Sequence, residues 1–334
     1  MNIRELLRCP KCGNVRLDYI KFDDQDFHAL KGSITCSQCS LVIIIQNGVL
    51  ICVGGDEDSS LSKIDKRNQK VYKETWRRGY EAYKEVNLTS EQELFNLWKN
   101  YFRANTMMDA GCGAGRLIET YAKLDIDSII FVDISDAIFQ CRENYLKYSK
   151  NKYEALFIKA SIKNLPIRDN HIDFTLSTGT INITSDQDAS LNELFRITKN
   201  NFLLGIITDK TLIGKTYIAT NVIKPFINRI NNFNLLFRIS GILSYIVFIF
   251  FKMLLLTGIL DKISGKDEIK KILGYKKCVS RLRYTIFDPL TVPIITKKED
   301  TFYIDFANRN NYLLIKQTTT SLMDYYLFEG KKDT

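Results

Sequence analysis

Residues 107–117 read Met-Met-Asp-Ala-Gly-Cys-Gly-Ala-Gly-Arg-Leu, and this stretch decides the fold of the 334-residue chain. The apolar Met107 and Met108 predict the end of a buried strand, with Asp109 at its carboxyl edge. Three glycines follow at alternate positions and predict a turn in which the backbone lies close to a ligand, because no Cβ intervenes. A tight turn at the end of a parallel strand is where open α/β sheets bind nucleotides.

A second apolar stretch, residues 129–132, also ends in an acid, Asp133, which is placed to accept hydrogen bonds from ribose hydroxyls. The glycine spacing differs from the Gly-x-Gly-x-x-Gly of pyrophosphate-binding loops, because the third glycine follows the second by two residues. Asp109 also places a negative charge where a pyrophosphate would lie. An acid there suits a cofactor with a cationic amino-acid end, which favours S-adenosylmethionine over a dinucleotide.

These motifs resemble those of the class I S-adenosylmethionine-dependent methyltransferases, in particular their type 11 group. Residues 109–115 are similar to the first motif of that family, and Asp133 matches the ribose-binding acid of the second. Residues 164–174 resemble the stretch that leads into the family's fourth strand, and residues 191–199 resemble the helix before its fifth. The four motifs occur in the family's order and spacing.

The resemblance covers residues 105–208 and resumes at 300–329. It implies an α/β fold with a Rossmann-like, seven-stranded sheet of the class I methyltransferase type, in which strands alternate with helices. We expect the methyltransferase domain at 106–208, completed by residues 300–330. Within these limits the expected later elements are strands at 155–159, 172–177 and 202–208, a helix at 301–310, and an antiparallel strand pair at 312–318 and 322–328.

The resemblance implies that S-adenosylmethionine binds at the carboxyl ends of these strands. Ser161 stands where the family usually has an adenine-binding acid, and Asn182-Ile183 replaces a His-His pair. The two histidines, His28 and His171, are expected at the surface, so the catalytic residues remain unknown. The candidate cofactor-binding residues are Asp109, Ala110, Gly111, Cys112, Gly113, Gly115, Asp133, Ile134, Ser161, Ile162 and Ser177.

Four of the eight cysteines form two Cys-x-x-Cys pairs near the start of the chain. Cys9 and Cys12 are separated by 23 residues from Cys36 and Cys39. Two such knuckles bring four thiolates into the tetrahedron of a structural zinc site, and we predict that these four cysteines bind zinc. A lapsed site that folds without metal is the alternative.

Residues 1–54, with apolar strands expected at 41–45 and 49–52, form the first predicted unit. It resembles the small zinc-ribbon partner and activator of tRNA, rRNA and protein methyltransferases. A similar ribbon is fused to many small-molecule methyltransferases, and it also opens some rRNA guanine methyltransferases. The resemblance implies a structural or docking role by default, and substrate recognition as the alternative.

Residues 55–105 are expected to form a linker and helices. Trp76 and Tyr80 lie four residues apart and therefore share one helix face. This face either packs on the Rossmann-like domain or, as the resemblance implies, closes over cofactor and substrate, with Trp76 and Tyr80 as candidate wall residues.

Residues 209–299 form an insertion whose centre, residues 239–260, is largely apolar, carries Lys252 as its one charge and approaches the length of a membrane-spanning helix. Three interpretations are open: a buried lid helix, an interfacial helix on an anionic membrane, and a transmembrane helix. Eight basic residues and two acids at 262–283 support the interfacial interpretation. Phe287 and Asp288 lie in a segment that resembles the substrate side of fused-ribbon methyltransferases.

The chain has 47 basic and 38 acidic residues, and its net charge of +9 suggests an anionic partner or surface. We predict an S-adenosylmethionine-dependent methyltransferase that acts at O or C of a small or lipid-linked acceptor. The alternatives are an RNA base methyltransferase that uses the ribbon for recognition, and an inactive cofactor-binding subunit that recruits a protein partner. No cleavable signal is visible, so we expect the cytoplasm, with the inner face of the membrane as one location.

Overall fold

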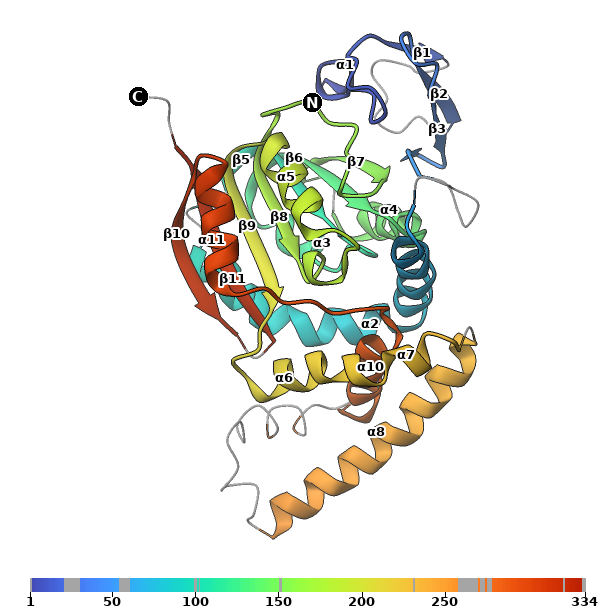
Figure 1. Ribbon diagram of the computed structural model, residues 1–334, viewed down its shortest axis with the longest axis vertical. Helices are drawn as coiled ribbons and strands as arrows, with labels where there is room; N and C mark the ends of the chain where they lie inside the picture. Colours follow the sequence, from blue (N-terminus) through green and yellow to red (C-terminus); the bar gives the residue numbers. More distant parts are fainter. Residues whose placement is uncertain are drawn as a thin grey trace.

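A computed structural model describes residues 2–20, 31–53, 61–98, 101, 103–149, 152–230, 232–257, 270, 274, 278–320 and 322–331. The protein has an α/β fold built on one mixed sheet (Figure 1). This architecture confirms the fold class predicted from the sequence.

The central part of the sheet has the strand order β7-β6-β5-β8-β9-β11-β10. The first five of these strands run parallel, and β11 pairs antiparallel with both β9 and β10. Parallel strands are covered by helices on both faces, which is why residues 129–132 are apolar without alternation and completely buried. The strands are β5 (Arg103–Ala110), β6 (Asp125–Asp133), β7 (Glu154–Lys159), β8 (Ile172–Thr178), β9 (Thr198–Ile207), β10 (Tyr312–Thr319) and β11 (Met323–Gly330).

Helices cover both faces of this sheet. On one face α5 (Gln187–Ile197) and α11 (Asp300–Arg309) contribute Leu194 and Phe306 to one buried cluster. On the other face α3 (Ile118–Tyr121) and α4 (Ala137–Tyr148) contribute to a second cluster. The last helix and the final strand pair lie where the sequence predicted them.

The N-terminal residues continue the same sheet. Strand β4 pairs parallel with β7, with Val49 opposite Phe157 and Ile51 opposite Lys159. Arg168 also donates hydrogen bonds to the carbonyl oxygens of Leu7 (2.9 Å) and Arg4 (2.8 Å). The sequence did not predict this continuity. The N-terminal elements are α1 (Ile3–Leu6), β1 (Leu17–Ile20), β2 (Lys31–Cys36), β3 (Val42–Gln46) and β4 (Val49–Ile51), which together make the sheet eleven-stranded.

One long helix, α2 (Lys63–Trp98), crosses the carboxyl ends of the parallel strands (Figure 1). Its first turn is fixed by Asp65, whose carboxylate accepts hydrogen bonds from Ser62 (2.8 Å) and Lys163 (2.7 Å). Asn68, further along α2, donates to the carbonyl oxygen of Ile183 (2.8 Å). These contacts hold α2 against the loops that follow β7 and β8.

The insertion forms helices on the far side of α2 (Figure 1). Near its start and end, Asn221 and Ile295 exchange side-chain and backbone hydrogen bonds of 2.6 and 3.1 Å. The described helices are α6 (Leu212–Ala219), η3 (Thr220–Val222), α7 (Lys224–Ile227), α8 (Phe233–Leu256) and α10 (Cys278–Thr291).

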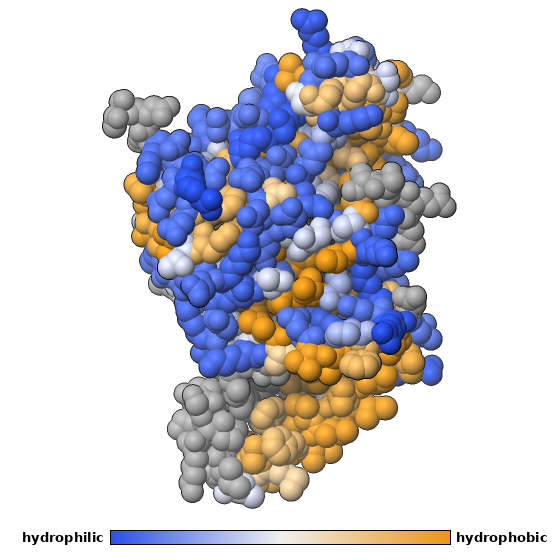
Figure 2. Space-filling view, in the orientation of Figure 1, coloured by the Kyte–Doolittle hydropathy of each residue, from blue (hydrophilic) through white to orange (hydrophobic). Residues whose placement is uncertain are grey.

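Helix α8 is apolar yet exposed. Leu236, Ser240 and Ser244 are its buried residues, whereas many of its large apolar side chains, including Ile242, Ile246 and Phe250, are exposed. Only 11% of the most apolar 18-residue stretch of α8 is buried, so the interpretation as a buried lid helix is wrong. By length and composition α8 is long and apolar enough to cross a membrane. Figure 2 shows the resulting apolar surface of α8, at the end of the molecule opposite the N-terminal strands β1 to β3.

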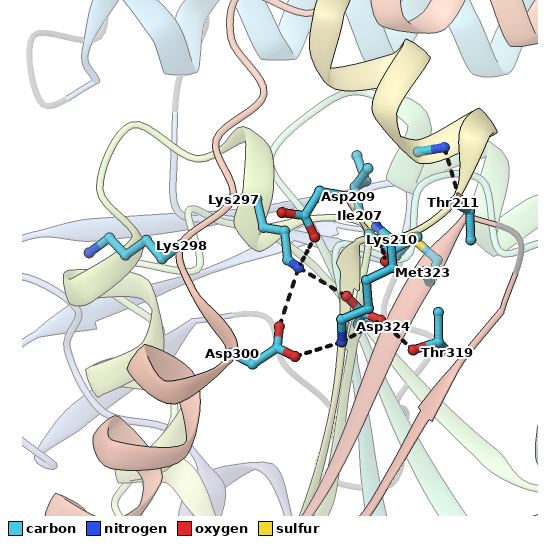
Figure 3. Close-up of polar contacts among 12 residues, drawn as sticks. Ile207, Asp209, Lys210, Thr211, Lys297, Lys298, Asp300, Thr319, Met323 and Asp324 are labelled. Carbon is cyan, nitrogen blue, oxygen red and sulfur yellow. Dashed lines mark hydrogen bonds and ion pairs between the residues drawn. The ribbon is translucent and has the colours of Figure 1, made fainter.

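The two ends of the insertion meet in a cluster of ion pairs (Figure 3). The ammonium of Lys297 lies 2.5 Å from Asp209, 3.1 Å from Asp324 and 3.2 Å from Asp300. Lys210 pairs with Asp300 at 2.6 Å and with Asp324 at 3.4 Å. Partial burial alone would raise the pKa of the Asp300 carboxyl, but its hydrogen bonds, including those from Lys210 and Lys297, hold this pKa well below its usual range.

We expect Lys297→Met to destabilise the protein by about 3 kcal/mol, because it leaves the fully buried Asp324 with the longer Lys210 contact as its only ion pair beside the hydrogen bond from Thr319, among the described residues. The neighbouring Lys298→Met is the control, since Lys298 pairs with the exposed Asp188 and such pairs contribute about 0–1 kcal/mol. Urea denaturation of both variants measures the difference. Equal midpoints would show that the cluster does not stabilise the fold.

Candidate functional site

The glycine-rich loop after β5 adopts a conformation that requires glycine. Gly111, Gly113 and Gly115 have φ values of +84°, +56° and +75°, a region that residues with a Cβ rarely adopt. The backbone N–H of Gly111 donates to the carbonyl oxygen of Val132 at 2.8 Å, which fixes the loop against β6. A Cβ on Gly111 would lie 2.0 Å from the hydroxyl oxygen of Thr180. The loop is therefore closely surrounded.

Two buried carboxylates flank this loop. Asp109 accepts a hydrogen bond from the Tyr121 hydroxyl at 2.7 Å. Asp133 accepts from the backbone N–H of Gly113 at 2.9 Å, and from the Ser135 N–H and hydroxyl at 2.8 and 2.6 Å. Burial raises the pKa of the Asp133 carboxyl, whereas the bonds from Ser135 and Gly113 oppose that rise. Each carboxylate retains acceptor capacity for a ligand.

The other predicted cofactor-binding residues lie at the same edge of the sheet. The N–H of Ala160 donates to the Asp133 carbonyl at 3.1 Å, which places Ser161 and Ile162 next to the end of β6. The hydroxyl of Ser177 donates to the carbonyl oxygen of Ala110 at 3.1 Å. The eleven candidate residues thus lie at the ends of β5 to β8, and their assignment to a cofactor stays a prediction.

Helix α2 covers the glycine loop. Trp76 and Tyr80 are buried against the residues around this loop, and a Cβ on Gly113 would lie 2.3 Å from the Trp76 indole. Gln69, two turns earlier, donates to the carbonyl oxygen of Ile134 at 3.1 Å. The two aromatic residues therefore pack on the Rossmann-like domain beside the glycine loop, and their role as walls of the site stays a prediction.

Three further residues shape the site and were not predicted from the sequence. Tyr121 holds Asp109, Ser135 holds Asp133, and Arg116 donates to the hydroxyl of Thr178 at 3.3 Å. The sequence contains only a weak signal for them, because each contact depends on how a loop or helix folds back over the strand ends. Arg116 alone is marked by its position after the third glycine.

The remaining polar candidates do not join the site. His171 is exposed at the opposite end of β8, with its ring Nδ1 2.7 Å from the Asp169 carbonyl oxygen, and His28 lies outside the described residues. Asn182, in the short helix η2 (Ile181–Ile183), is fully buried and donates to the carbonyl oxygen of Thr296 at 2.9 Å. Its role here is to hold the end of the insertion against the sheet.

The two residues suggested for the substrate side differ in their surroundings. Phe287 is fully buried in the contact between α8 and α10, where its ring meets that of Phe237 edge-on at 5.3 Å. Asp288 accepts a short hydrogen bond from the Tyr217 hydroxyl. Burial raises the pKa of the Asp288 carboxyl, against the effects of Tyr217 and Lys224.

The four N-terminal cysteines form one cluster. Cys9, Cys12, Cys36 and Cys39 have sulfur atoms that all lie within 4.8 Å of one another. The two knuckles have matching backbones: Gly13 and Ser40 both have left-handed φ, and their N–H groups donate to the carbonyls of Cys9 and Cys36 at 2.9 and 3.0 Å. The N–H of Cys39 lowers the pKa of the Cys36 thiol to about 6 against desolvation. This arrangement fits one tetrahedral metal ion.

We expect the purified protein to contain about one zinc ion per chain, because four thiols at this spacing form a closed tetrahedral site. Cys36→Ser should lose the metal, whereas Cys52→Ser, outside the cluster, should retain it. Elemental analysis after exhaustive dialysis measures both. A wild-type protein without metal, in which all four thiols react freely, would contradict the assignment.

Residues 108–204 match the family model described as a methyltransferase domain. The matched segment begins at the end of β5 and ends within β9, so it contains the glycine loop and Asp133. Residues 108–204 therefore belong to the methyltransferase-domain family. With this segment and its strand order, the chain is an S-adenosylmethionine-dependent methyltransferase of class I fold.

Several solved structures are similar to this chain. One is the magnesium protoporphyrin IX methyltransferase of Synechocystis PCC 6803 with bound SAH (11% identity, TM-score 0.47, 80% of this chain and 98% of that chain). Others are a SAM-dependent methyltransferase from Aquifex aeolicus (11%, 0.40, 70% and 87%) and the Haloferax volcanii complex of the Trm112 methyltransferase activator with a methyltransferase (17%, 0.29, 43% and 60%). At these scores no similarity bears on substrate or partner. No curated protein matches the chain.

Proposed function

We propose that this protein transfers a methyl group from S-adenosylmethionine to an oxygen or carbon of a small or lipid-linked acceptor, at the cytoplasmic surface of an anionic membrane. The observation that carries the membrane part is the exposure of α8. The buried carboxylates beside the glycine loop support the cofactor part.

The residues at the strand ends suit S-adenosylmethionine, which supplies an electrophilic methyl group on a sulfonium. Asp109 provides a negative charge for the cationic amino-acid end, and Asp133 provides acceptors for ribose hydroxyls. Ile134, Ser161 and Ile162 form the candidate adenine side. Ser177 lies at the end of β8, where the acceptor is expected.

The position of helix α2 over the glycine loop also suits methyl transfer. Methyl transfer is an in-line displacement, so positioning and the exclusion of water supply much of the catalysis. The buried rings of Trp76 and Tyr80 cover the glycine loop and exclude water from it. Gln69 and Lys73 tie α2 to the loop after β6, with a Lys73–Asp136 distance of 2.8 Å.

The side chains of α8 are arranged in the opposite way to those of a soluble amphipathic helix. Its small polar residues Ser240 and Ser244 face inward, while Ile242, Ile246 and Phe250 face outward. Its 24 residues extend about 36 Å. An apolar surface of this size is expected to be covered by lipid or by another apolar partner. The net charge of +9 favours an anionic membrane.

One end of α8 is fixed to the rest of the protein. The guanidinium of Arg283 lies 3.5 Å from the centre of the Phe237 ring and donates to the Phe237 carbonyl at 2.8 and 3.1 Å. Lys252, near the other end of α8, is exposed. Its long aliphatic side chain allows the ammonium to reach the polar surface of a membrane. These features fit a helix that lies in the membrane surface while its first turns stay attached to the enzyme.

A second candidate function is RNA base methylation, favoured by the four-cysteine ribbon. An inactive subunit that binds the cofactor and recruits a partner is a third. Incubation with methyl-labelled S-adenosylmethionine and a host extract, followed by separation into lipid, RNA, protein and small polar fractions, distinguishes them. Label in lipid or small molecules supports the proposal, label in RNA supports the second candidate, and no label despite cofactor binding supports the third.

We expect Asp109→Asn and Asp133→Ala to weaken S-adenosylmethionine binding at least tenfold, because hydrogen bonds to charged groups contribute about 1.5–3 kcal/mol. Asp127→Ala is the control, since this acid is exposed near the start of β6. Isothermal titration calorimetry measures the dissociation constants. Unchanged affinity in both variants would disprove the cofactor assignment.

We expect the protein to float with vesicles of phosphatidylcholine and phosphatidylglycerol. The double variant Ile246→Gln/Phe250→Gln should lose this binding, because each replacement removes about 1.5–3 kcal/mol of apolar burial. Val42→Gln/Ile44→Gln on the ribbon is a matched control: these side chains are 52% and 55% exposed, against 57% and 55% for the α8 pair. Equal loss in both variants would contradict a specific role for α8, and resistance to alkaline extraction would indicate a spanning helix instead.

A further inference from the structure

The insertion contains buried polar atoms that the contacts described above do not satisfy. Lys224, the first residue of α7, is 3% exposed, and its ammonium makes no hydrogen bond within the described part of the chain. The Oδ1 atom of Asp288 on α10 is also buried and unbonded there, while its Oδ2 accepts from Tyr217. One donor and one acceptor, from two different helices, are therefore left without partners.

Neither atom satisfies the other. Among the described residues, no ion pair joins Lys224 to Asp288 within 4.0 Å, yet their charges act on each other. Burial lowers the pKa of the Lys224 ammonium to about 7 against the attraction of the Asp288 carboxylate. Burying such groups without hydrogen bonds costs several kcal/mol. Folded proteins leave few buried polar atoms in this state, and those that remain often mark a site for a ligand or an ordered water.

More unsatisfied atoms lie close by. The Oδ1 atom of Asn228, one turn after Lys224, and that of Asn68 on α2 are buried without a hydrogen bond in the described structure. Arg67, next to Asn68, donates to the Asn228 carbonyl oxygen at 3.3 Å, so the two helices are in direct contact. Unsatisfied atoms thus occur on both α2 and the insertion segment that contacts it.

Tyr72 on α2 connects this region to the cofactor site. Burial raises the pKa of its hydroxyl well above the usual value, and the carboxylates of Asp288 and Asp133 raise it further. The charges of the insertion's Asp288 and of the proposed ribose acid thus both act on this one hydroxyl. Tyr217 and Val292, which both donate hydrogen bonds to Asp288, are buried in the apolar cluster against which Tyr72 packs.

We propose that Lys224 and Asp288 bind a hydroxyl group of the methyl acceptor. A hydroxyl is the smallest group that both donates and accepts, so it can donate to Asp288 Oδ1 and accept from Lys224 Nζ. The apolar surroundings suit an acceptor whose body is apolar, as a membrane-derived molecule would be. This inference rests on the proposed function and assigns a substrate class to it: hydroxyl-bearing apolar molecules.

The test uses the full-length protein, labelled S-adenosylmethionine and a dilution series of whole host extract. Lys224→Met and Asp288→Asn should each raise the half-saturating extract concentration roughly tenfold to hundredfold, as expected for a lost hydrogen bond to a charged group. Affinity for S-adenosylhomocysteine should stay within about twofold of wild type, because neither residue belongs to the cofactor loop. Lys215→Met, an exposed lysine on neighbouring α6, is the matched control.

Thermal unfolding of the ligand-free variants separates binding from a structural role. A site kept for a ligand carries unpaired polar atoms at the expense of stability, so both variants should melt at or above the wild-type temperature. Activity lost together with the melting temperature would show that the pair serves the fold, and unchanged half-saturation would overturn the site. An acceptor that carries no hydroxyl before it is methylated would overturn it as well. Wild-type protein that binds no S-adenosylhomocysteine would instead refute the proposed function itself.

Discussion

The hydrogen bond from the Gly113 N–H to the Asp133 carboxylate is the contact on which the arrangement of this molecule depends. It ties the turn after the first strand of the methyltransferase domain to the end of the second, at 2.9 Å and out of contact with water. The turn can approach so closely only because its glycines adopt left-handed φ. The same absence of a Cβ lets Trp76 pack on Gly113, so the position of α2 follows from that of the loop.

Close contacts continue from α2 to the apolar helix. Tyr284 on α10 packs directly on Gly79 of α2, because a Cβ on Gly79 would lie 2.5 Å from the Tyr284 ring. The Tyr284 hydroxyl also donates to the Arg78 carbonyl oxygen. Arg283, the preceding residue, holds Phe237 at the start of α8. Gly79 thus permits the close contact between α2 and α10, just as Gly113 permits the close contact between α2 and the glycine loop. A membrane-bound α8 would be coupled to the glycine loop through these packed side chains.

The sequence predicts the positions of the strands of the methyltransferase domain well because their signals are local. Buried parallel strands read as continuous apolar runs, and the two acids mark where strands end. Contacts between distant segments carry no such signal. The pairing of β4 with β7 and the bond from Tyr121 to Asp109 are examples. Composition also cannot separate a buried apolar helix from an exposed one, which is why the lid interpretation of α8 was wrong.

The continuity of the sheet bears on the role of the ribbon. An unpaired edge of β7 would expose a row of backbone donors and acceptors, and β4 covers that edge. The four cysteines hold the knuckles from which β2 and β3 extend toward β4. A metal in this cluster would therefore stabilise the edge of the catalytic sheet directly, because ligand binding to the folded state adds to its stability. This arrangement gives the ribbon a sufficient structural reason to be present, without requiring it to recognise RNA.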